Sequence, residues 1–239
     1  MSTDRDADDA CDATLATYEA NTALYIAKTP THAAHTTRLL TRLAGLVPGG
    51  HVLELGTGPG WAADLLETLG LTVDRTDATV AFVQLLREAG HGARVLDARA
   101  PDYGGPYDAV LALAVLLHLD HARCEEALAT ALRATRPGGV LALTLKEGDG
   151  DEWTTVKLDA PRHMTYWREG PLLEALRRAG WAVESLDHVA DRPHDWLFVI
   201  ARHPDDASRH RCPRWESNPY FGGFKPPASA GWATGASAP

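Results

Sequence analysis

The chain has 239 residues, of which 45% are hydrophobic and 23% charged, and its formal net charge is -9. This length suits one α/β domain with a buried core, and the negative charge disfavours general binding to nucleic-acid phosphates. No apolar run approaches the roughly 18 residues of a membrane span, the N-terminus is acidic, and the three cysteines lie far apart. We therefore expect a cytoplasmic protein that binds no nucleic acid, no membrane and no metal.

The spacing of apolar residues predicts helices that alternate with short strands. The elements expected in chain order are helices at 13–27 and 31–46, a strand at 51–55, a helix at 61–69, a strand at 71–76, a helix at 79–89, strands at 93–96 and 107–114, a helix at 120–135, a strand at 140–145, a helix at 172–179 and strands at 181–186 and 196–201. Such alternation indicates βαβ units. We predict an α/β fold with a Rossmann-like, mostly parallel sheet of seven strands, helices on both faces and an antiparallel closing strand.

A glycine-rich turn follows the first predicted strand. The stretch from Val52 to Gly60 reads Val-Leu-Glu-Leu-Gly-Thr-Gly-Pro-Gly, and a helix begins directly after it. Glycines turn the chain tightly and let its backbone touch a ligand, while the free N–H groups of the helix N-terminus face that ligand. In a parallel sheet such a turn lies at the carboxyl ends of the strands. The turn therefore predicts a site for a nucleotide-type ligand.

The residues around the turn favour one nucleotide-type ligand over another. A dinucleotide fingerprint needs a third glycine or alanine where this chain has Trp61, whose indole would obstruct the helix–strand contact. Glu54, two residues before the first glycine, is no part of that fingerprint and would favour a cationic ligand. S-adenosylmethionine carries an ammonium and a sulfonium and has no phosphate. We therefore predict this cofactor, with an NAD-dependent oxidoreductase as the first alternative.

With these features the turn resembles the first motif of class I S-adenosylmethionine-dependent methyltransferases. The chain is most similar to the bacterial small-molecule type, such as the ubiquinone and menaquinone biosynthesis enzymes. Later family motifs follow in order: Asp77 after the second strand, the pair Asp97-Ala98, the fourth strand with residues 107–118, and the turn at 136–141. The resemblance covers about residues 15–203.

The resemblance implies a division of the chain and a set of cofactor-binding residues. The segments are a disordered N-terminus at 1–10, one domain at 11–203 made of a helical cap at 11–46, a cofactor-binding core at 51–145 and an acceptor-side insertion with closing strands at 146–203, and a disordered tail at 204–239. The cofactor-binding residues are Tyr25, Glu54, Gly56, Thr57, Gly58, Gly60, Asp77, Ala78, Asp97, Ala98 and Leu113.

Several of these residues have simpler interpretations. Asp77 is placed to bind ribose hydroxyls, yet it could also cap the helix that starts near Thr79, and Asp74 is a competing acid on the same strand. Glu54 and Asp97 could be ordinary residues at strand ends. Tyr25 could serve helix packing alone, and Tyr18 is a weaker candidate for the same role.

Other residues are candidates for the acceptor side. His118 follows the fourth strand, where family members often face the substrate, and histidine suits proton transfer near neutral pH. The alternative is a hydrogen-bonded histidine at a helix entrance. His163, Tyr166 and Trp167 are expected in the acceptor pocket, with plugging of the sheet edge as the alternative.

The expected reaction is in-line methyl transfer from S-adenosylmethionine to an oxygen, nitrogen or carbon atom of a small-molecule acceptor. The stretch at 114–117 reads Ala-Val-Leu-Leu and lacks an Asn-Pro-Pro-Tyr-type motif, which argues against exocyclic amines of nucleobases. A second alternative is a non-catalytic protein that only binds S-adenosylmethionine.

Overall fold

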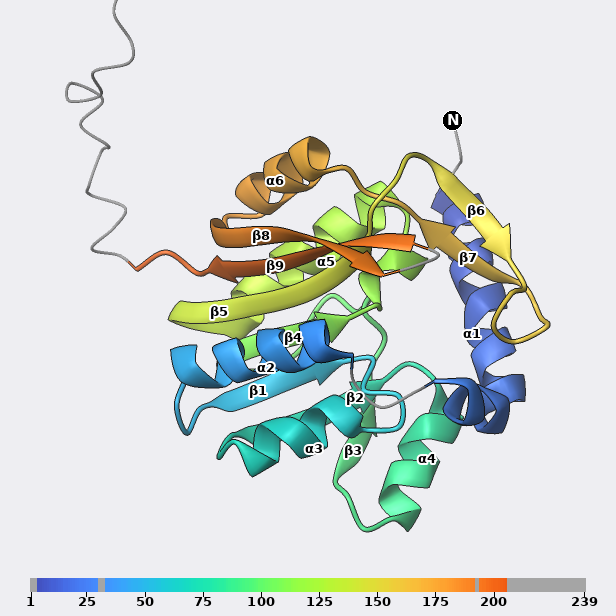
Figure 1. Cartoon of the computed structure of the whole chain (residues 1–239), viewed down its shortest axis with the longest axis horizontal. Helices are drawn as coiled ribbons and strands as arrows, with labels where there is room; N and C mark the ends of the chain where they lie inside the picture. The colour runs from blue at the N-terminus through green and yellow to red at the C-terminus, as the bar shows by residue number, and fades with distance from the viewer. Residues whose placement is uncertain (1–3, 30–32, 192–193, 206–239) are drawn as a thin grey trace, which may run out of the picture.

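The centre of the computed structural model, which describes residues 4–29, 33–191 and 194–205, is a seven-stranded sheet (Figure 1). Its strands are β1 (His51–Leu55), β2 (Thr72–Asp77), β3 (Ala93–Val95), β4 (Tyr107–Leu113), β5 (Thr135–Lys146), β8 (Ala182–Asp191) and β9 (His194–Arg202). They lie in the order β3-β2-β1-β4-β5-β9-β8. The first five run parallel, and β9 is antiparallel to both of its neighbours. The predicted fold class is confirmed.

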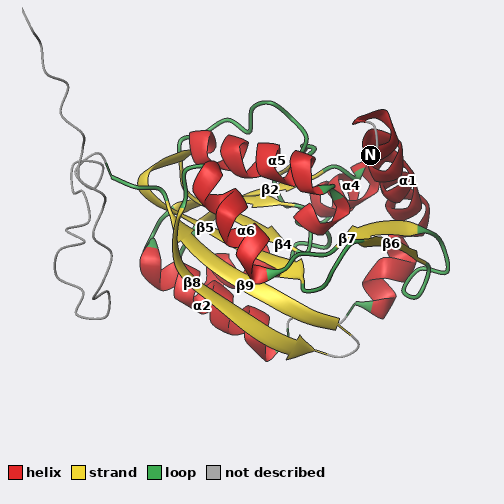
Figure 2. Cartoon of the chain, turned by 90° about the horizontal axis from the view of Figure 1, so that it is seen from above, coloured by secondary structure: helices red, strands yellow, loops and turns green. Residues whose placement is uncertain are grey.

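Helices cover both faces of the sheet. Figure 2 shows α5 (His121–Ala134) and α6 (Glu169–Arg178) on the face opposite α2 (Ala34–Leu46). On the α2 side, α3 (Trp61–Thr68) packs against α2 and β2, and α4 (Val80–Glu88) packs against β2 and β3. The apolar side chains form one core cluster on each side. Burial on both faces explains why β4 reads as a continuous apolar run.

The first helix starts earlier than the sequence predicts. It is α1 (Asp4–Lys28), so the expectation of disorder at 1–10 is wrong for residues 4–10. Asp8 pairs there with Arg99 and Arg123, and these partners, which lie far along the sequence, hold the polar N-terminal turns against the domain. The helix is interrupted at Asn21, whose backbone is not helical (φ -126°, ψ 23°).

A small hairpin occupies the predicted insertion. It consists of β6 (Asp151–Thr154) and β7 (Arg162–Thr165), which pair antiparallel and lie beside α1 at the carboxyl ends of the parallel strands (Figure 1). The Thr17 hydroxyl donates to the Pro161 carbonyl at 2.7 Å, and the His163 N–H donates to the Thr14 hydroxyl at 2.9 Å. Together α1 and the hairpin enclose the space beyond the strand ends.

Most of the tail predicted at 204–239 lies outside the described residues, which end at residue 205. Among the helices of the described ranges, none is both long and apolar enough to span a bilayer.

Candidate functional site

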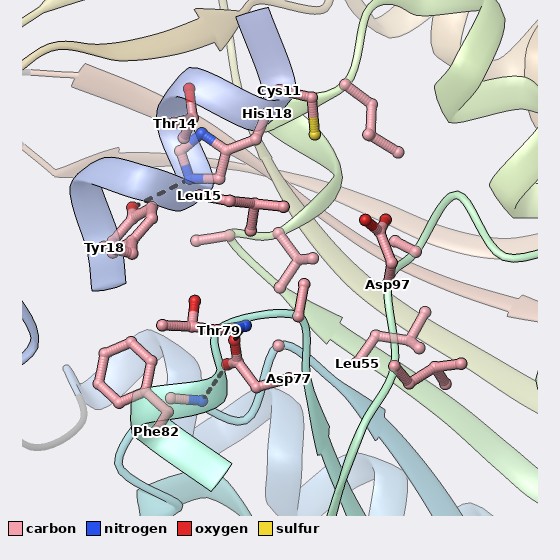
Figure 3. Close-up of a pocket in the computed structure, with 18 of the residues that line it drawn as sticks. Cys11, Thr14, Leu15, Tyr18, Leu55, Asp77, Thr79, Phe82, Asp97 and His118 are labelled. Carbon is pink, nitrogen blue, oxygen red and sulfur yellow. Dashed lines mark hydrogen bonds between the residues drawn. The ribbon is translucent and has the colours of Figure 1, made fainter. Parts of the chain in front are cut away.

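A cleft opens at the carboxyl ends of β1, β2 and β4, and α1 forms one of its walls (Figure 3). It contains about 740 Å³ of space free of protein atoms, part of it open to solvent. The predicted residues that line it are Tyr25, Gly56, Gly58, Asp77, Ala78, Asp97, Ala98, Leu113 and His118. Its place in the sheet suits a small-molecule ligand.

The three glycines of the loop have different surroundings. All have positive φ, which favours glycine. A Cβ at Gly56 would lie 2.2 Å from a methyl group of Val115, and one at Gly60 would lie 2.8 Å from a leucine methyl of α4. At Gly58 the nearest atom would be a ring carbon of Tyr25 at 3.9 Å. Close packing therefore requires the first and third glycines, whereas the second leaves open a space inside the cleft.

Asp77 ties this loop to the end of β2. Its carboxylate accepts hydrogen bonds from the Gly58 and Thr79 N–H groups, both at 2.8 Å (Figure 3). Burial raises the pKa of Asp77 above its ordinary value. The competing acid, Asp74, instead binds His51 and Tyr107 and does not line the cleft. Of the two acids, the geometry makes Asp77 the candidate for a ligand hydroxyl.

The other predicted loop residues lie outside the lining of the cleft. Glu54 is buried beneath the loop, where it accepts a hydrogen bond from the Thr57 hydroxyl at 2.6 Å. Burial raises its pKa to about 7. Glu54, Thr57 and Gly60 shape the loop from below, and their contact with a cofactor stays a prediction.

His118 belongs to a partly buried hydrogen-bonded chain that leads to α1. It follows β4 in the short 3-10 helix η1 (Leu116–His118). The His163 carbonyl can only accept, so at 2.8 Å it fixes the imidazole proton on Nδ1. The Tyr18 hydroxyl then donates to His118 Nε2 at 3.0 Å (Figure 3), and Arg162 Nη1 donates to the Tyr18 oxygen at 3.1 Å.

This environment keeps the imidazole neutral. Burial, together with the nearby positive charges of Arg162 and Lys146, lowers the pKa of His118 to about 4. A neutral imidazole with so low a pKa is a weak proton acceptor at pH 7. The hydrogen-bonded arrangement is the one expected for the alternative interpretation of His118, and its catalytic role stays a prediction.

The pKa of His118 predicts a loss of stability in acid. Between its ordinary value of 6.5 and the folded value of about 4, the unfolded chain binds a proton that the folded chain does not. Acidification through this range should therefore lower the free energy of unfolding, by up to roughly 3 kcal/mol. The measurement is urea unfolding of the wild type and of His118→Asn between pH 7 and pH 4.

His118→Asn serves as the reference because Glu54 acts with the opposite sign. The folded pKa of Glu54, about 7, lies above its ordinary 4.5, so its contribution is present in acid and is lost as the pH rises through 7. That contribution is common to both proteins and cancels in their difference. The stability advantage of the wild type over His118→Asn should shrink on acidification, and a difference independent of pH would contradict the assignment.

The helix α1 contributes several cleft residues, of which Cys11, Thr14 and Leu15 were not predicted from the sequence. Cys11, Thr14, Leu15 and Tyr18 all line the cleft (Figure 3). Their spacing of three, four and seven residues places them on one face of a helix, which is the signal that could have identified them. Of this face only Tyr18 was a candidate.

None of the three aromatic residues expected in the acceptor pocket lines the cleft, although the His163 carbonyl accepts a hydrogen bond from His118. His163 contacts Asp151 and lines a second, separate cavity. The Tyr166 hydroxyl donates to Glu152, and Trp167, only 2% exposed, packs in the core. The burial of Trp167 agrees with the alternative that these residues serve packing, and a substrate role for all three stays a prediction.

A sequence model described as a methyltransferase domain matches residues 28–186. The chain belongs to this methyltransferase family. It is an S-adenosylmethionine-dependent methyltransferase. A search of curated proteins found no match.

Solved structures share the fold of this methyltransferase. One is the 1,6-didemethyltoxoflavin-N1-methyltransferase of Burkholderia thailandensis, with bound S-adenosylhomocysteine, which is 18% identical over 86% of this chain and 92% of its own, with a TM-score of 0.65. The CcbJ methyltransferase of Streptomyces caelestis is 19% identical over 71% and 89%, with a TM-score of 0.59. The [4+2]-cyclase SpnF is 19% identical over 71% and 82%, with a TM-score of 0.58. These identities establish a shared fold.

The cleft suits S-adenosylmethionine, the cofactor of this methyltransferase. Its described lining contains two carboxylates, Asp77 and Asp97, and neither Lys nor Arg. Carboxylates accept hydrogen bonds from ribose hydroxyls and attract a cationic ligand. The open space over Gly58 admits a ligand against the backbone. The carboxylates that line the cleft and the open space over Gly58 therefore fit this cofactor.

Proposed function

We propose that this methyltransferase methylates an oxygen, nitrogen or carbon atom of a small-molecule acceptor. The observation that carries the proposal is the arrangement of the cleft, with cofactor-type residues at the strand ends and Tyr18, held by His118, on the opposite wall. When bound, S-adenosylmethionine supplies an activated methyl group for in-line displacement. Among the structural neighbours are the 1,6-didemethyltoxoflavin-N1-methyltransferase and the CcbJ methyltransferase, which supports the same class of reaction.

The cofactor-side residues would bind and orient S-adenosylmethionine. Asp77 would accept hydrogen bonds from ribose hydroxyls, and Asp97 with Ala98 would border the adenine. Tyr25 stands over the loop, with its ring carbon 3.9 Å from the Cβ position of Gly58. The tyrosine rings on α1 would exclude water from the space between the loop and the hairpin, so that acceptor and methyl group meet in a fixed geometry.

Tyr18 would accept a hydrogen bond from the methyl acceptor. Its oxygen has two lone pairs, and Arg162 occupies one of them. The other can accept a hydrogen bond from an O–H or N–H group of the acceptor. Because the low pKa of His118 makes it a poor base, we assign His118 a positioning role in which its Nε2 fixes the direction of the Tyr18 hydroxyl.

The test of the proposed function is a screen with S-adenosylmethionine that carries an isotope-labelled methyl group. The protein is incubated with fractionated small metabolites, and labelled products are identified by mass spectrometry. The proposal predicts a labelled small molecule that depends on the protein. Binding of S-adenosylhomocysteine without any labelled product would contradict it and favour a non-catalytic binding protein.

Tyr18→Phe should reduce turnover without weakening cofactor binding. The change removes the hydroxyl that would contact the acceptor, so we expect kcat to fall by roughly 10–100-fold, within the range of a lost proton-handling group. The affinity for S-adenosylhomocysteine should stay within about threefold of the wild type, or about 0.7 kcal/mol, because the lost hydroxyl would contact the acceptor and not the cofactor. The measurements are product formation on the acceptor found in the screen and calorimetry.

Tyr107→Phe is a matched control. The Tyr107 hydroxyl is also buried, donates to Asp74 and accepts from Arg94, but it lies at the start of β4, away from the cleft. Both variants lose a hydroxyl with one donated and one accepted hydrogen bond, so their stability losses should be similar. Equal kcat in the two variants would exclude a role of Tyr18 in turnover.

A further inference from the structure

Three cationic side chains lie on the hairpin side of the cleft, near Tyr18 and Tyr25. Lys146 ends β5, Lys157 lies in the connection between β6 and β7, and Arg162 begins β7. Lys146 and Arg162 are only 7% and 5% exposed. Within the described ranges of the chain, none of the three forms an ion pair with a carboxylate.

Arg162 has unused hydrogen-bonding capacity. Its Nη1 donates to the Tyr18 hydroxyl at 3.1 Å, while its Nε is buried and has no partner. An unsatisfied buried donor costs free energy, and a charged one costs more. The guanidinium group presents parallel N–H donors that match the two oxygens of a carboxylate or phosphate. An anion at this place would satisfy both the charge and the free donor.

Arg162 and Lys157 contact the two tyrosines that line the cleft, whereas the Lys146 ammonium lies 5.7 Å from the ring centre of Tyr166. The Arg162 guanidinium lies 5.7 Å from the Tyr18 ring centre, and the Lys157 ammonium lies 4.3 Å from the Tyr25 ring centre. The two rings meet edge to face at 5.4 Å. The positive charges of Arg162 and Lys157 are therefore adjacent to the cleft, on its hairpin side.

The charges of the cluster act on one another. Burial and the neighbouring charges of Arg162 and Lys146 lower the pKa of Lys157 to about 8. The acid whose charge acts on Lys146 is Glu152, but its carboxylate accepts the Tyr166 hydroxyl instead of forming an ion pair. The positive potential on this side of the cleft is thus uncompensated, although the net charge of the chain is -9.

We propose that Lys146, Lys157 and Arg162 bind an anionic oxygen group of the acceptor, either a carboxylate or a phosphate. This inference rests on the proposed function, because it places the acceptor on the hairpin side of the same cleft. On the cofactor-binding side the lining carboxylates are Asp77 and Asp97, the latter paired with Arg99, whereas the unpaired cations lie on the hairpin side. Methyl acceptors without a negative group should bind weakly.

The test measures anion binding to the protein saturated with S-adenosylhomocysteine. Calorimetry and the side-chain Nε–H NMR signal of Arg162 are followed during titration with 4-hydroxybenzoate, phenyl phosphate and the neutral 4-hydroxybenzamide. We expect at least one of the two anions to bind roughly tenfold more tightly than the amide, a difference of about 1.4 kcal/mol. The preferred anion distinguishes a carboxylate from a phosphate.

Three variants show which cations are responsible. Arg162→Met should abolish the preference for the anion, and Lys157→Met, which removes no hydrogen bond between side chains, should reduce it severalfold even if the first variant unfolds. Arg177→Met, an exposed change on α6, removes the same charge as Arg162→Met and should change nothing.

Several outcomes would overturn the anion site. Equal binding of the amide and both anions, or no anion binding up to about 10 mM, would do so. A tenfold loss of S-adenosylhomocysteine affinity in Arg162→Met would assign the cations to the carboxylate of the cofactor itself and would also overturn it. Failure of S-adenosylhomocysteine to bind the wild type would count against the proposed function instead, so the two failures are distinguishable.

Discussion

Replacement of Gly58 by alanine should lower the affinity for S-adenosylhomocysteine by about 100-fold or more, or roughly 2.7 kcal/mol. The added Cβ would project into the cleft, because the nearest protein atom would be a Tyr25 ring carbon at 3.9 Å. In the proposed site, the cofactor approaches the backbone through that space. The protein should still fold, since the change adds only the cost of an alanine at φ +53°, about 1–2 kcal/mol. The measurements are calorimetric titration and thermal unfolding.

Gly70→Ala separates this effect from backbone strain. Gly70 has φ +88°, lies at the end of α3 and would place a Cβ in open space away from the cleft. It should lose at least as much stability as Gly58→Ala and keep wild-type affinity. Gly56→Ala should instead fail to fold stably, because its Cβ would lie 2.2 Å from Val115. An affinity of Gly58→Ala within threefold of the Gly70→Ala value would refute the loop assignment.

Asp77→Asn should weaken both the fold and cofactor binding. The carboxylate accepts two backbone N–H groups, and an amide has only one oxygen, so one buried donor would lose its partner. Such a loss costs about 1–3 kcal/mol of stability. The ribose would lose a charged acceptor, which should lower affinity by roughly 10–100-fold, corresponding to about 1.4–2.7 kcal/mol. Calorimetry and urea unfolding measure the two effects.

Asp74→Asn is the control for this prediction. Asp74 lies on the same strand, and its carboxylate also accepts two hydrogen bonds, from His51 and Tyr107. We expect a stability loss with unchanged affinity for S-adenosylhomocysteine. If Asp74→Asn lowered the affinity and Asp77→Asn did not, the ribose would be assigned to the wrong acid.

The parallel core could be predicted because its local signals agree with its tertiary environment. The strand β4 is buried on both faces and has an apolar sequence. Gly56 and Gly60 have positive φ and are closely packed, so these positions favour glycine. Asp120, at the start of the predicted helix, caps α5 by accepting a hydrogen bond from the Arg123 N–H at 2.7 Å. Such features depend on neighbours close in the sequence.

The missed features depend on partners far along the chain. Residues 4–10 are helical in a polar segment, where Asp8 pairs with Arg99 and Arg123. The hairpin of β6 and β7 brings Arg162 to Tyr18, a separation of 144 residues. No periodicity in either segment reports that contact.

The same distinction applies to the candidate site. Asp77 and Gly58 were identified by their places in motifs, and the structure brings them within one hydrogen bond of each other. Glu54 fits the motif equally well, yet it lies beneath the loop, because motif position does not determine the direction of a side chain. Trp167 was selected for its chemistry, but its burial in the core follows from packing against α5 and α6, which the sequence alone does not reveal.

The central claim is that the cleft between the glycine loop and α1 holds S-adenosylmethionine, with Asp77 at the ribose. A crystal structure of the protein with S-adenosylhomocysteine tests it most directly. We predict the ribose hydroxyls within hydrogen-bond distance of the Asp77 carboxylate, the adenine beside Asp97 and Ala98, and the backbone of Gly58 against the ligand. S-adenosylhomocysteine bound outside this cleft, or bound in it with its ribose away from Asp77, would contradict the account.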